Sequence, residues 1–136
     1  MDELLATARD AREAAYAPYS EFPVGAAVET TDGSVYAGCN VEIANYSNSL
    51  HAEEIAVGKA VSDGHTAVER VAVSGGTSPG LRPCGACRQT LAEFAADDAV
   101  VLSDAGPDEP PLTDRLGDLL PEAIGPSDLG VDPDGE

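Results

Sequence analysis

The sequence predicts an α/β fold in which a mixed β-sheet is sandwiched between helices. Two strand-like runs flank Asp32-Gly33, a dipeptide typical of hairpin turns. Downstream of this hairpin, helical and strand patterns alternate, which is typical of strands connected through helices. The chain has 136 residues, of which 43% are hydrophobic, so it is long enough for one domain with a buried core.

The first half of the chain is expected to form a helix, the hairpin and a second helix. Apolar residues at near-helical spacing follow Asp2 and Glu3, whose acidic side chains suit a helix N-terminus, and Pro18 ends that helix. Asn48 and Ser49 are both candidates to cap the second helix. In chain order the expected segments are a helix over 2–15, strands over 24–29 and 35–41, a loop over 44–49 and a helix over 51–63.

The second half is expected to continue the alternation. The glycines of residues 75–80 allow a phosphate-binding loop, but no Gly-Lys-Ser/Thr follows, so a plain connection is expected. The expected segments are a strand over 68–74, a helix over 84–95, a strand over 99–103, a loop with a brief edge strand over 107–111, and a short helix capped by Thr113 and ending at Pro121. Residues 1–125 are thus expected to form one domain, and 126–136 an acidic C-terminal tail on the surface.

The charge balance is strongly acidic. The net charge is −18, from 25 Asp and Glu against 7 Lys and Arg. Nucleic-acid partners are therefore not expected, since their binding depends on basic side chains that neutralise phosphates. The acids are spread along the chain and are not confined to a tail, which favours an acidic surface suited to a high-salt (halophilic) cytosol.

Hydropathy and cysteine usage indicate a cytoplasmic protein without a membrane span. No apolar run approaches the ~20 residues that a spanning helix needs, and no signal-peptide pattern opens the chain. There are three cysteines, two of them in a Cys-x-x-Cys motif. This pattern favours metal binding over a disulfide framework in a reducing compartment.

Two motifs at predicted helix starts carry the chemistry. One is His51-x-Glu53, and the other is Pro83-Cys84-x-x-Cys87. A catalytic zinc ion takes three protein ligands and keeps its fourth position for water, and His51, Cys84 and Cys87 are three such ligands. Glu53 is spaced to carry protons beside the metal. The joint pattern is the signature of zinc-dependent nucleobase deaminases.

The expected chemistry follows from the charges of these groups. Helix N-termini stabilise thiolates, so they are expected to lower the pKa of both cysteines. One imidazole and two thiolates give a nearly neutral zinc site that acidifies bound water, and the resulting hydroxide is the expected nucleophile. Glu53 would accept the water proton and deliver it to the ring nitrogen and then to the departing amine.

Two other interpretations of these residues remain open from the sequence. Cys39 could complete a closed Cys₃His structural zinc site, which leaves no position for water. Cys39 lies in a strand pattern where a buried free cysteine is common, and a structural site would leave Glu53 without a role. Alternatively, His51 could be a core histidine and Glu53 a solvated acid, but this does not explain why both motifs occur together.

Residues 15–121 resemble the small, homotetrameric type of cytidine deaminase. The similarity includes residues 15–27, residues 38–42 and both metal motifs, with residues 83–89 matching fully. The resemblance implies a three-layer αβα sandwich around a mixed sheet of about five strands, one Zn²⁺ per chain, and hydrolysis of cytidine or 2′-deoxycytidine to the uridine product plus ammonia in pyrimidine salvage.

The resemblance also implies roles for five further residues. Phe22 would lie against the pyrimidine ring, Asn40 and Glu42 would bind a sugar hydroxyl, the Ala52 backbone would contact the base, and Tyr46 would reach the site of a neighbouring subunit. The alternative for Phe22 is that it is an ordinary core aromatic residue. Without the resemblance, Asn40 and Glu42 are better interpreted as a strand-end turn with a solvated acid.

Three positions depart from the family pattern, and related functions stay open. Glu54 occupies a position where members with three cysteine ligands usually carry Arg, Ile124 stands where Phe is typical, and Ile43 replaces a usual Asn. The alternatives are deamination of blasticidin S or dCMP, or a non-catalytic zinc module. A nucleotide substrate would need a basic contact, for which Arg82 and Arg88 are the candidates.

Overall fold

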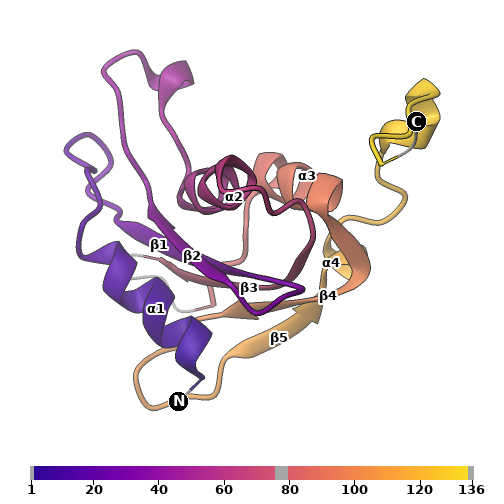
Figure 1. The fold of residues 1–136 in the computed structure, drawn as a ribbon. Helices are drawn as coiled ribbons and strands as arrows, with labels where there is room; N and C mark the ends of the chain where they lie inside the picture. The colour runs from indigo at the N-terminus through magenta and orange to yellow at the C-terminus, as the bar shows by residue number, and fades with distance from the viewer. Residues whose placement is uncertain (1, 76–79, 135–136) are drawn as a thin grey trace.

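The computed structural model describes residues 2–75 and 80–134 and has a five-stranded mixed sheet with helices on both faces (Figure 1). Strand order across the sheet is β2-β1-β3-β4-β5, where the strands span Val35–Cys39, Val24–Thr30, Val68–Gly75, Ala95–Ser103 and Leu112–Arg115. The helices are α1 (Glu3–Arg12), α2 (Ala52–Ser62), α3 (Gly85–Phe94) and α4 (Leu116–Leu119), with 3₁₀ turns η1 (Tyr46–Asn48) and η2 (Pro126–Leu129).

Three of the four strand pairings are antiparallel, and β3 pairs with β4 in parallel. The antiparallel β1–β2 pair is the hairpin predicted from Asp32-Gly33, and Gly33 there has a φ of 90°, which glycine adopts without strain. Parallel pairing of β3 and β4 needs a long crossover, which contains α3. The predicted mixed α/β sheet is thus confirmed.

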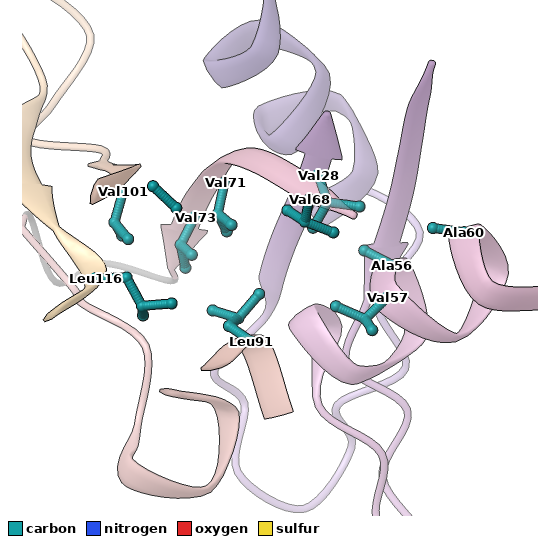
Figure 2. Packing of buried hydrophobic residues seen from close by; sticks show 11 residues of the cluster. Val28, Ala56, Val57, Ala60, Val68, Val71, Val73, Leu91, Val101 and Leu116 are labelled. Carbon is teal, nitrogen blue, oxygen red and sulfur yellow. The ribbon is translucent and has the colours of Figure 1, made fainter. Parts of the chain in front are cut away.

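Helices cover the two faces of the sheet with separate apolar clusters. On one face, α1 packs Leu4, Leu5 and Ala8 against Ala27 and other small or aliphatic strand residues. On the other face, side chains of α2, α3 and α4 converge on the valines of β1, β3 and β4 (Figure 2). Neighbouring strand residues point to opposite faces, so the two clusters alternate along each strand and the architecture has three layers.

Several element boundaries differ from the sequence-based expectation. Helix α1 ends at Arg12, three residues early, and β2 ends at Cys39. Thr113 does not cap a helix, because it pairs with Leu102 inside β5, and α4 begins only after Arg115. The edge strand was expected over 107–111 and lies at Leu112–Arg115 instead. Of the expected loop over 75–80, residues 76–79 lie outside the described residues.

Some of these differences come from strand pairing, which the local pattern of residues does not show. Strand β4 starts at Ala95, four residues before the expected strand, directly after α3. Asp97 and Asp98 are exposed acids in this part of the strand, so its sequence lacks the apolar pattern by which a buried strand is recognised. The N-cap of α2 is His51 itself, not Asn48 or Ser49, because residues 46–48 form η1 one turn earlier.

An ion pair between distant segments fastens α1 to the end of β4. Arg9 donates from Nε to Asp104 Oδ2 at 2.8 Å and from Nη2 to Oδ1 at 2.6 Å, and Ser74 Oγ donates to the same carboxylate at 2.7 Å. The Arg9 guanidinium holds the pKa of the Asp104 carboxyl well below its usual range. Bidentate pairs of this kind are among the stronger ion pairs in proteins.

A glycine on β2 sets the position of α2 relative to the sheet. A Cβ on Gly38 would lie 2.5 Å from the carbonyl oxygen of Ala52 and 2.7 Å from the amide nitrogen of Ala56. Glycine therefore lets the first turn of α2 approach the strand closely. None of the helices within residues 2–75 and 80–134 has the length and apolar character needed to cross a membrane.

Candidate active site

The two motif segments meet where α2 and α3 begin. His51 is the N-cap of α2, Cys84 is the N-cap of α3, and Cys87 lies in the first turn of α3. The Nδ1 atom of His51 lies 3.1 Å from Cys87 Sγ and 3.3 Å from Cys84 Sγ. All three ligand atoms lie within 4.8 Å of one another. Two helix starts on one side of the sheet thus bring one imidazole and two thiols to a single point.

This donor set fits a zinc ion. Zinc–nitrogen and zinc–sulfur bonds of about 2.0 and 2.3 Å at tetrahedral angles place N and S roughly 3.5 Å apart. The observed separations of 3.1 and 3.3 Å are close to that value. Imidazole and thiolate are also the ligands that zinc prefers, whereas the oxygen-rich sites of calcium and magnesium need carboxylates and carbonyls.

Cys39 does not belong to this cluster. It lies at the end of β2, where its backbone pairs with Gly25, and it is a free, partly buried cysteine. Within residues 2–75 and 80–134, the group of side chains able to hold a metal consists of His51, Cys84 and Cys87. The closed Cys₃His alternative is therefore not supported, and the fourth zinc position is left to a non-protein ligand.

The carboxylate of Glu53 is buried beside this cluster. Only 5% of the residue is exposed, and burial raises the pKa of its carboxyl group, while the nearby His51 and the Cys87 thiol act in the opposite direction. A carboxyl group whose pKa is raised by burial is suited to accept and return a proton. Its position next to the ligands follows from the His-x-Glu spacing at the start of α2.

Glu54, which departs from the family pattern, has a structural role at the same helix start. Its Oε1 accepts a hydrogen bond from the His51 backbone N–H at 2.9 Å. The same atom lies 3.8 Å from His51 Nδ1. Such a contact from the third helical residue back to the N-cap is one half of a capping box, which fixes the first turn of a helix.

The expectation that the helix N-terminus lowers the pKa of both cysteines is wrong for Cys87 in the metal-free chain. Cys87 is fully buried, and this burial, together with the negative charge of Glu53, raises the pKa of its thiol. Desolvation of a buried charge outweighs the helix dipole here. Zinc binding would therefore have to displace a proton from this thiol.

A pocket of about 440 Å³ opens in front of the cluster. This volume lies within the usual range for small-molecule sites. Four residues singled out from the sequence line it, namely Phe22, Asn40, Glu42 and Ala52, together with His51, Glu53 and Cys84. They come from the segment before β1, the end of β2 and the starts of α2 and α3, so four separate segments of the chain meet around one cavity.

Asn40 uses its side-chain amide to hold the segment that carries Phe22. Its Oδ1 accepts from the Val24 backbone N–H at 2.9 Å, and its Nδ2 donates to the Phe22 carbonyl at 3.0 Å. One N–H of the amide and one acceptor site remain for a ligand. Phe22 is half-buried at the pocket wall.

Glu42 is held by a turn formed by Tyr19 and Ser20. Its Oε1 accepts from the backbone N–H groups of both residues at 3.0 Å, and its Oε2 accepts from the Ser20 hydroxyl. The Ser20 hydroxyl and these backbone donors lower the pKa of Glu42, so its side chain is a carboxylate at neutral pH.

Tyr46 is the one predicted substrate-binding residue that does not line the pocket of its own chain. It is 71% exposed on η1, in the magenta loop that stands away from the sheet in Figure 1, and its ring makes an edge contact with Tyr19 at 5.6 Å. Ile43 and Ile124 are also exposed. Arg88 donates to the carbonyls of Pro83 and Leu119 and so supports the fold.

Sequence reasoning gave no substrate-binding role to five residues that line the pocket: Ser20, Val24, Ser49, Leu50 and Leu81. Ser20 and Val24 lie inside the matching segment 15–27, and Arg82 was considered only as a phosphate contact. Arg82 lies at the pocket wall, where its Nε donates to Asp114 Oδ2 at 2.8 Å. Neither metal motif includes these positions, which reach the cavity from segments that are separate in the sequence.

A three-layer α/β fold, a three-ligand zinc site and a buried carboxylate define the class of zinc-dependent hydrolytic deaminases. The chain belongs to the family described as the cytidine and deoxycytidylate deaminase zinc-binding region, whose model matches residues 1–103. It is 44% identical over 137 residues to a cytidine deaminase of Sporosarcina psychrophila, with 95% of this chain and 94% of the relative covered. A cytidine deaminase of Mycobacterium tuberculosis is 41% identical over 126 residues, which cover 93% and 90% of the two chains.

Solved structures agree with this membership. The crystal structure of a cytidine deaminase from Burkholderia pseudomallei superposes with a TM-score of 0.83 at 41% identity, covering 90% of this chain and 97% of that chain. The cytidine deaminase from Mycobacterium tuberculosis superposes with a TM-score of 0.77 at 42% identity, covering 90% and 95%. The expected three-layer deaminase fold is therefore confirmed.

Proposed function

We propose that this protein is a zinc-dependent hydrolase that converts cytidine and 2′-deoxycytidine to uridine and 2′-deoxyuridine with release of ammonia. The observation that carries the proposal is the buried Glu53 beside the His51, Cys84 and Cys87 cluster at the pocket. A proton-carrying carboxylate next to an incomplete set of zinc ligands is the arrangement needed to hydrolyse an exocyclic amine.

In the proposed reaction, three side chains hold the metal ion and a fourth, that of Glu53, transfers protons. Zinc held by His51, Cys84 and Cys87 supplies a water of lowered pKa as the nucleophile. Glu53 would take one proton of that water and pass it to the ring nitrogen next to the reacting carbon. It would then move the remaining proton of the added hydroxyl to the amine, so that the C–N bond breaks, the carbonyl forms and ammonia leaves. Because Glu53 is buried, its carboxyl group exchanges protons with the reactants rather than with bulk water.

The substrate is expected to lie with its base toward Ala52 and its sugar toward Glu42. Phe22 would stack on the pyrimidine ring, and the Ala52 backbone would bind the base edge. The remaining hydrogen-bonding capacity of Asn40 and Glu42 would bind a sugar hydroxyl. All four residues line the same 440 Å³ pocket, which supports this assignment.

The first test is direct. Purified protein loaded with zinc is incubated with cytidine, and the loss of the cytosine ultraviolet absorbance is followed as uridine forms. Turnover that depends on bound zinc is the expected result. Absence of turnover with cytidine and deoxycytidine in the zinc-loaded protein would favour the non-catalytic zinc module or a related nucleoside such as blasticidin S.

Cytidine should be a far better substrate than CMP. Glu42 contributes a negative charge to the pocket, and the only arginine lining it, among the described residues, is Arg82, which is paired with Asp114. A phosphate brought beside Glu42 is opposed by like charge, a cost of several kcal/mol, so kcat/KM for CMP should be lower by about 10²-fold or more. Steady-state kinetics with both substrates measure this, and equal values would remove Glu42 from sugar recognition and favour the nucleotide alternative.

We propose further that four chains assemble and that Tyr46 reaches the site of a neighbouring subunit. The support is the exposure of Tyr46 on a loop that stands away from the sheet, and the exposed Ile43 and Leu50 nearby.

We also propose a domain of residues 1–125 followed by an acidic tail of residues 126–136. The support is that none of residues 117–134 is buried. A cytoplasmic location and a role in pyrimidine salvage, without nucleic-acid partners, fit the reduced thiols, the acidic charge and the nucleoside substrate.

We propose that the acidic surface adapts the protein to a high-salt cytosol. The chain carries a net charge of −18. Arg9, Arg70 and Arg82 form ion pairs with Asp104, Asp2 and Asp114, but acids outnumber bases by far. Like charges therefore oppose both compaction and association of chains in dilute buffer.

Stability should consequently rise steeply with KCl. At about 1 M salt the Debye length falls to about 3 Å, which screens most of this repulsion. Each kcal/mol of relieved repulsion should raise the melting temperature by roughly 3–6 °C for a chain of this size. Circular dichroism and light scattering across a KCl series follow folding and mass together. If melting temperature and mass are the same in dilute buffer and in molar KCl, the acids only keep the protein in solution.

A further inference from the structure

The turn before β1 contains a serine that links two residues on opposite sides of the proposed substrate. The Ser20 hydroxyl donates to Glu42 Oε2 and accepts from the Phe22 backbone N–H at 3.1 Å. Glu42 is the residue assigned to the sugar, and Phe22 is the residue assigned to the base. Ser20 itself also lines the pocket. One hydroxyl group therefore connects the sugar end and the base end of the site.

The hydrogen bonds to Glu42 leave little capacity for further donors. A carboxylate offers about four acceptor sites, and three are used by Ser20 Oγ, Ser20 N and Tyr19 N. Roughly one acceptor site then remains for a ligand. Because donors from the turn contact both oxygens, the carboxylate is held in one orientation, and the free site faces a single direction.

The backbone of the turn is shaped to make this arrangement. Glu21, between Ser20 and Phe22, has a φ of 56°, in the left-handed region that residues other than glycine adopt with strain. Its N–H donates to the Ala17 carbonyl at 3.0 Å, which closes the turn. Strain of this kind persists where the surrounding structure requires it, and it is often found at ligand sites.

We propose that Ser20 is a positioning residue for sugar recognition: it orients Glu42 so that its one free acceptor site receives a single ribose hydroxyl. This inference rests on the proposed function, in which Glu42 binds that hydroxyl. Ser20 has no contact with the reacting carbon in this assignment. Its loss should weaken recognition of the sugar hydroxyl and leave the rest of the reaction unchanged.

The test compares two substrates in the same variant. Ser20→Ala removes one of the three donors to Glu42 and the acceptor of the Phe22 N–H. It keeps both backbone donors to Glu42 and the bond from the Glu21 N–H to the Ala17 carbonyl, so the turn can still form. A hydrogen bond to a charged group contributes enough that kcat/KM for cytidine should fall about 5–20-fold. For 3′-deoxycytidine, kcat/KM should change by less than about 2-fold, because this substrate lacks the hydroxyl that Glu42 would bind. The two substrates and the two proteins together form a double-mutant cycle, which isolates the coupling between Ser20 and that hydroxyl.

Two further variants serve as controls. Ser20→Thr keeps a hydroxyl at the same position and should restore the cytidine preference. Ser62→Ala removes an exposed hydroxyl at the end of α2, away from the pocket, and should leave both substrates unaffected. Zinc content and circular dichroism of each variant report whether the protein is folded and loaded.

The outcomes separate this inference from the function on which it rests. An equal loss on both substrates, or no loss on either, would overturn the positioning role of Ser20 while leaving cytidine deamination intact. If the unmodified protein does not prefer cytidine over 3′-deoxycytidine, the assignment of Glu42 to the sugar fails, and the role of Ser20 fails with it. Absence of any deamination of cytidine refutes the proposed function itself.

Discussion

Replacing Glu53 by Gln is expected to abolish nearly all turnover while the fold and the zinc content are retained. Glu53 is the buried carboxylate beside the proposed metal ligands. The other carboxylate that lines the pocket, among the described residues, is that of Glu42, which is held by the Tyr19–Ser20 turn. The amide of Gln has nearly the same shape, so packing is kept, but it can neither accept nor deliver the protons that hydrolysis moves.

The size of this effect follows from the two transfers that Glu53 is proposed to make. One general acid–base group typically contributes about 10²–10⁴-fold, and a group that serves twice should lie near the upper end. Steady-state kinetics with cytidine, together with zinc analysis, measure the effect. Glu69→Gln is the matched control, since Glu69 is exposed on β3 and the same change there should leave activity unaltered. Activity of Glu53→Gln within about tenfold of the parent would exclude Glu53 as the proton carrier.

The second large effect concerns the metal itself. Cys84→Ser and Cys87→Ser should each lose most of their zinc, whereas Cys39→Ser should keep about one zinc per chain, because only the first two cysteines lie in the cluster with His51. Outer contacts alone typically change metal affinity by about 10–100-fold, so the loss of a direct ligand should exceed that range.

Cys39 is the natural control in this experiment. It is a cysteine of the same chain, at the end of β2, and Cys39→Ser makes the same chemical change outside the cluster. Metal analysis after dialysis against a mild chelator, with circular dichroism to check folding, gives the result. Loss of zinc from Cys39→Ser would instead support the closed structural site with four protein ligands.

The sequence alone was sufficient for the chemistry and for the type of fold. His51, Glu53, Cys84 and Cys87 are recognisable because zinc ligation demands particular side chains, and their spacing at helix starts is a local property. The hairpin at Asp32-Gly33 and the alternation of helix and strand patterns are local as well, so the mixed sheet could be predicted. Residues such as Phe22 and Glu42 were found only through the family resemblance, since nothing in their spacing links them to the metal motifs.

Only the tertiary structure decided which distant segments lie next to one another and which contacts they make. The exclusion of Cys39, the capping contact of Glu54, the arrangement of Ser20 with Glu42 and the pairing of Thr113 in β5 all depend on which segments become neighbours in the folded chain. The raised pKa of the Cys87 thiol belongs to the same group, because the helix start argued for a lowered value and burial reversed it. Burial and hydrogen-bond partners are properties of the packed chain, and local patterns of residues do not contain them.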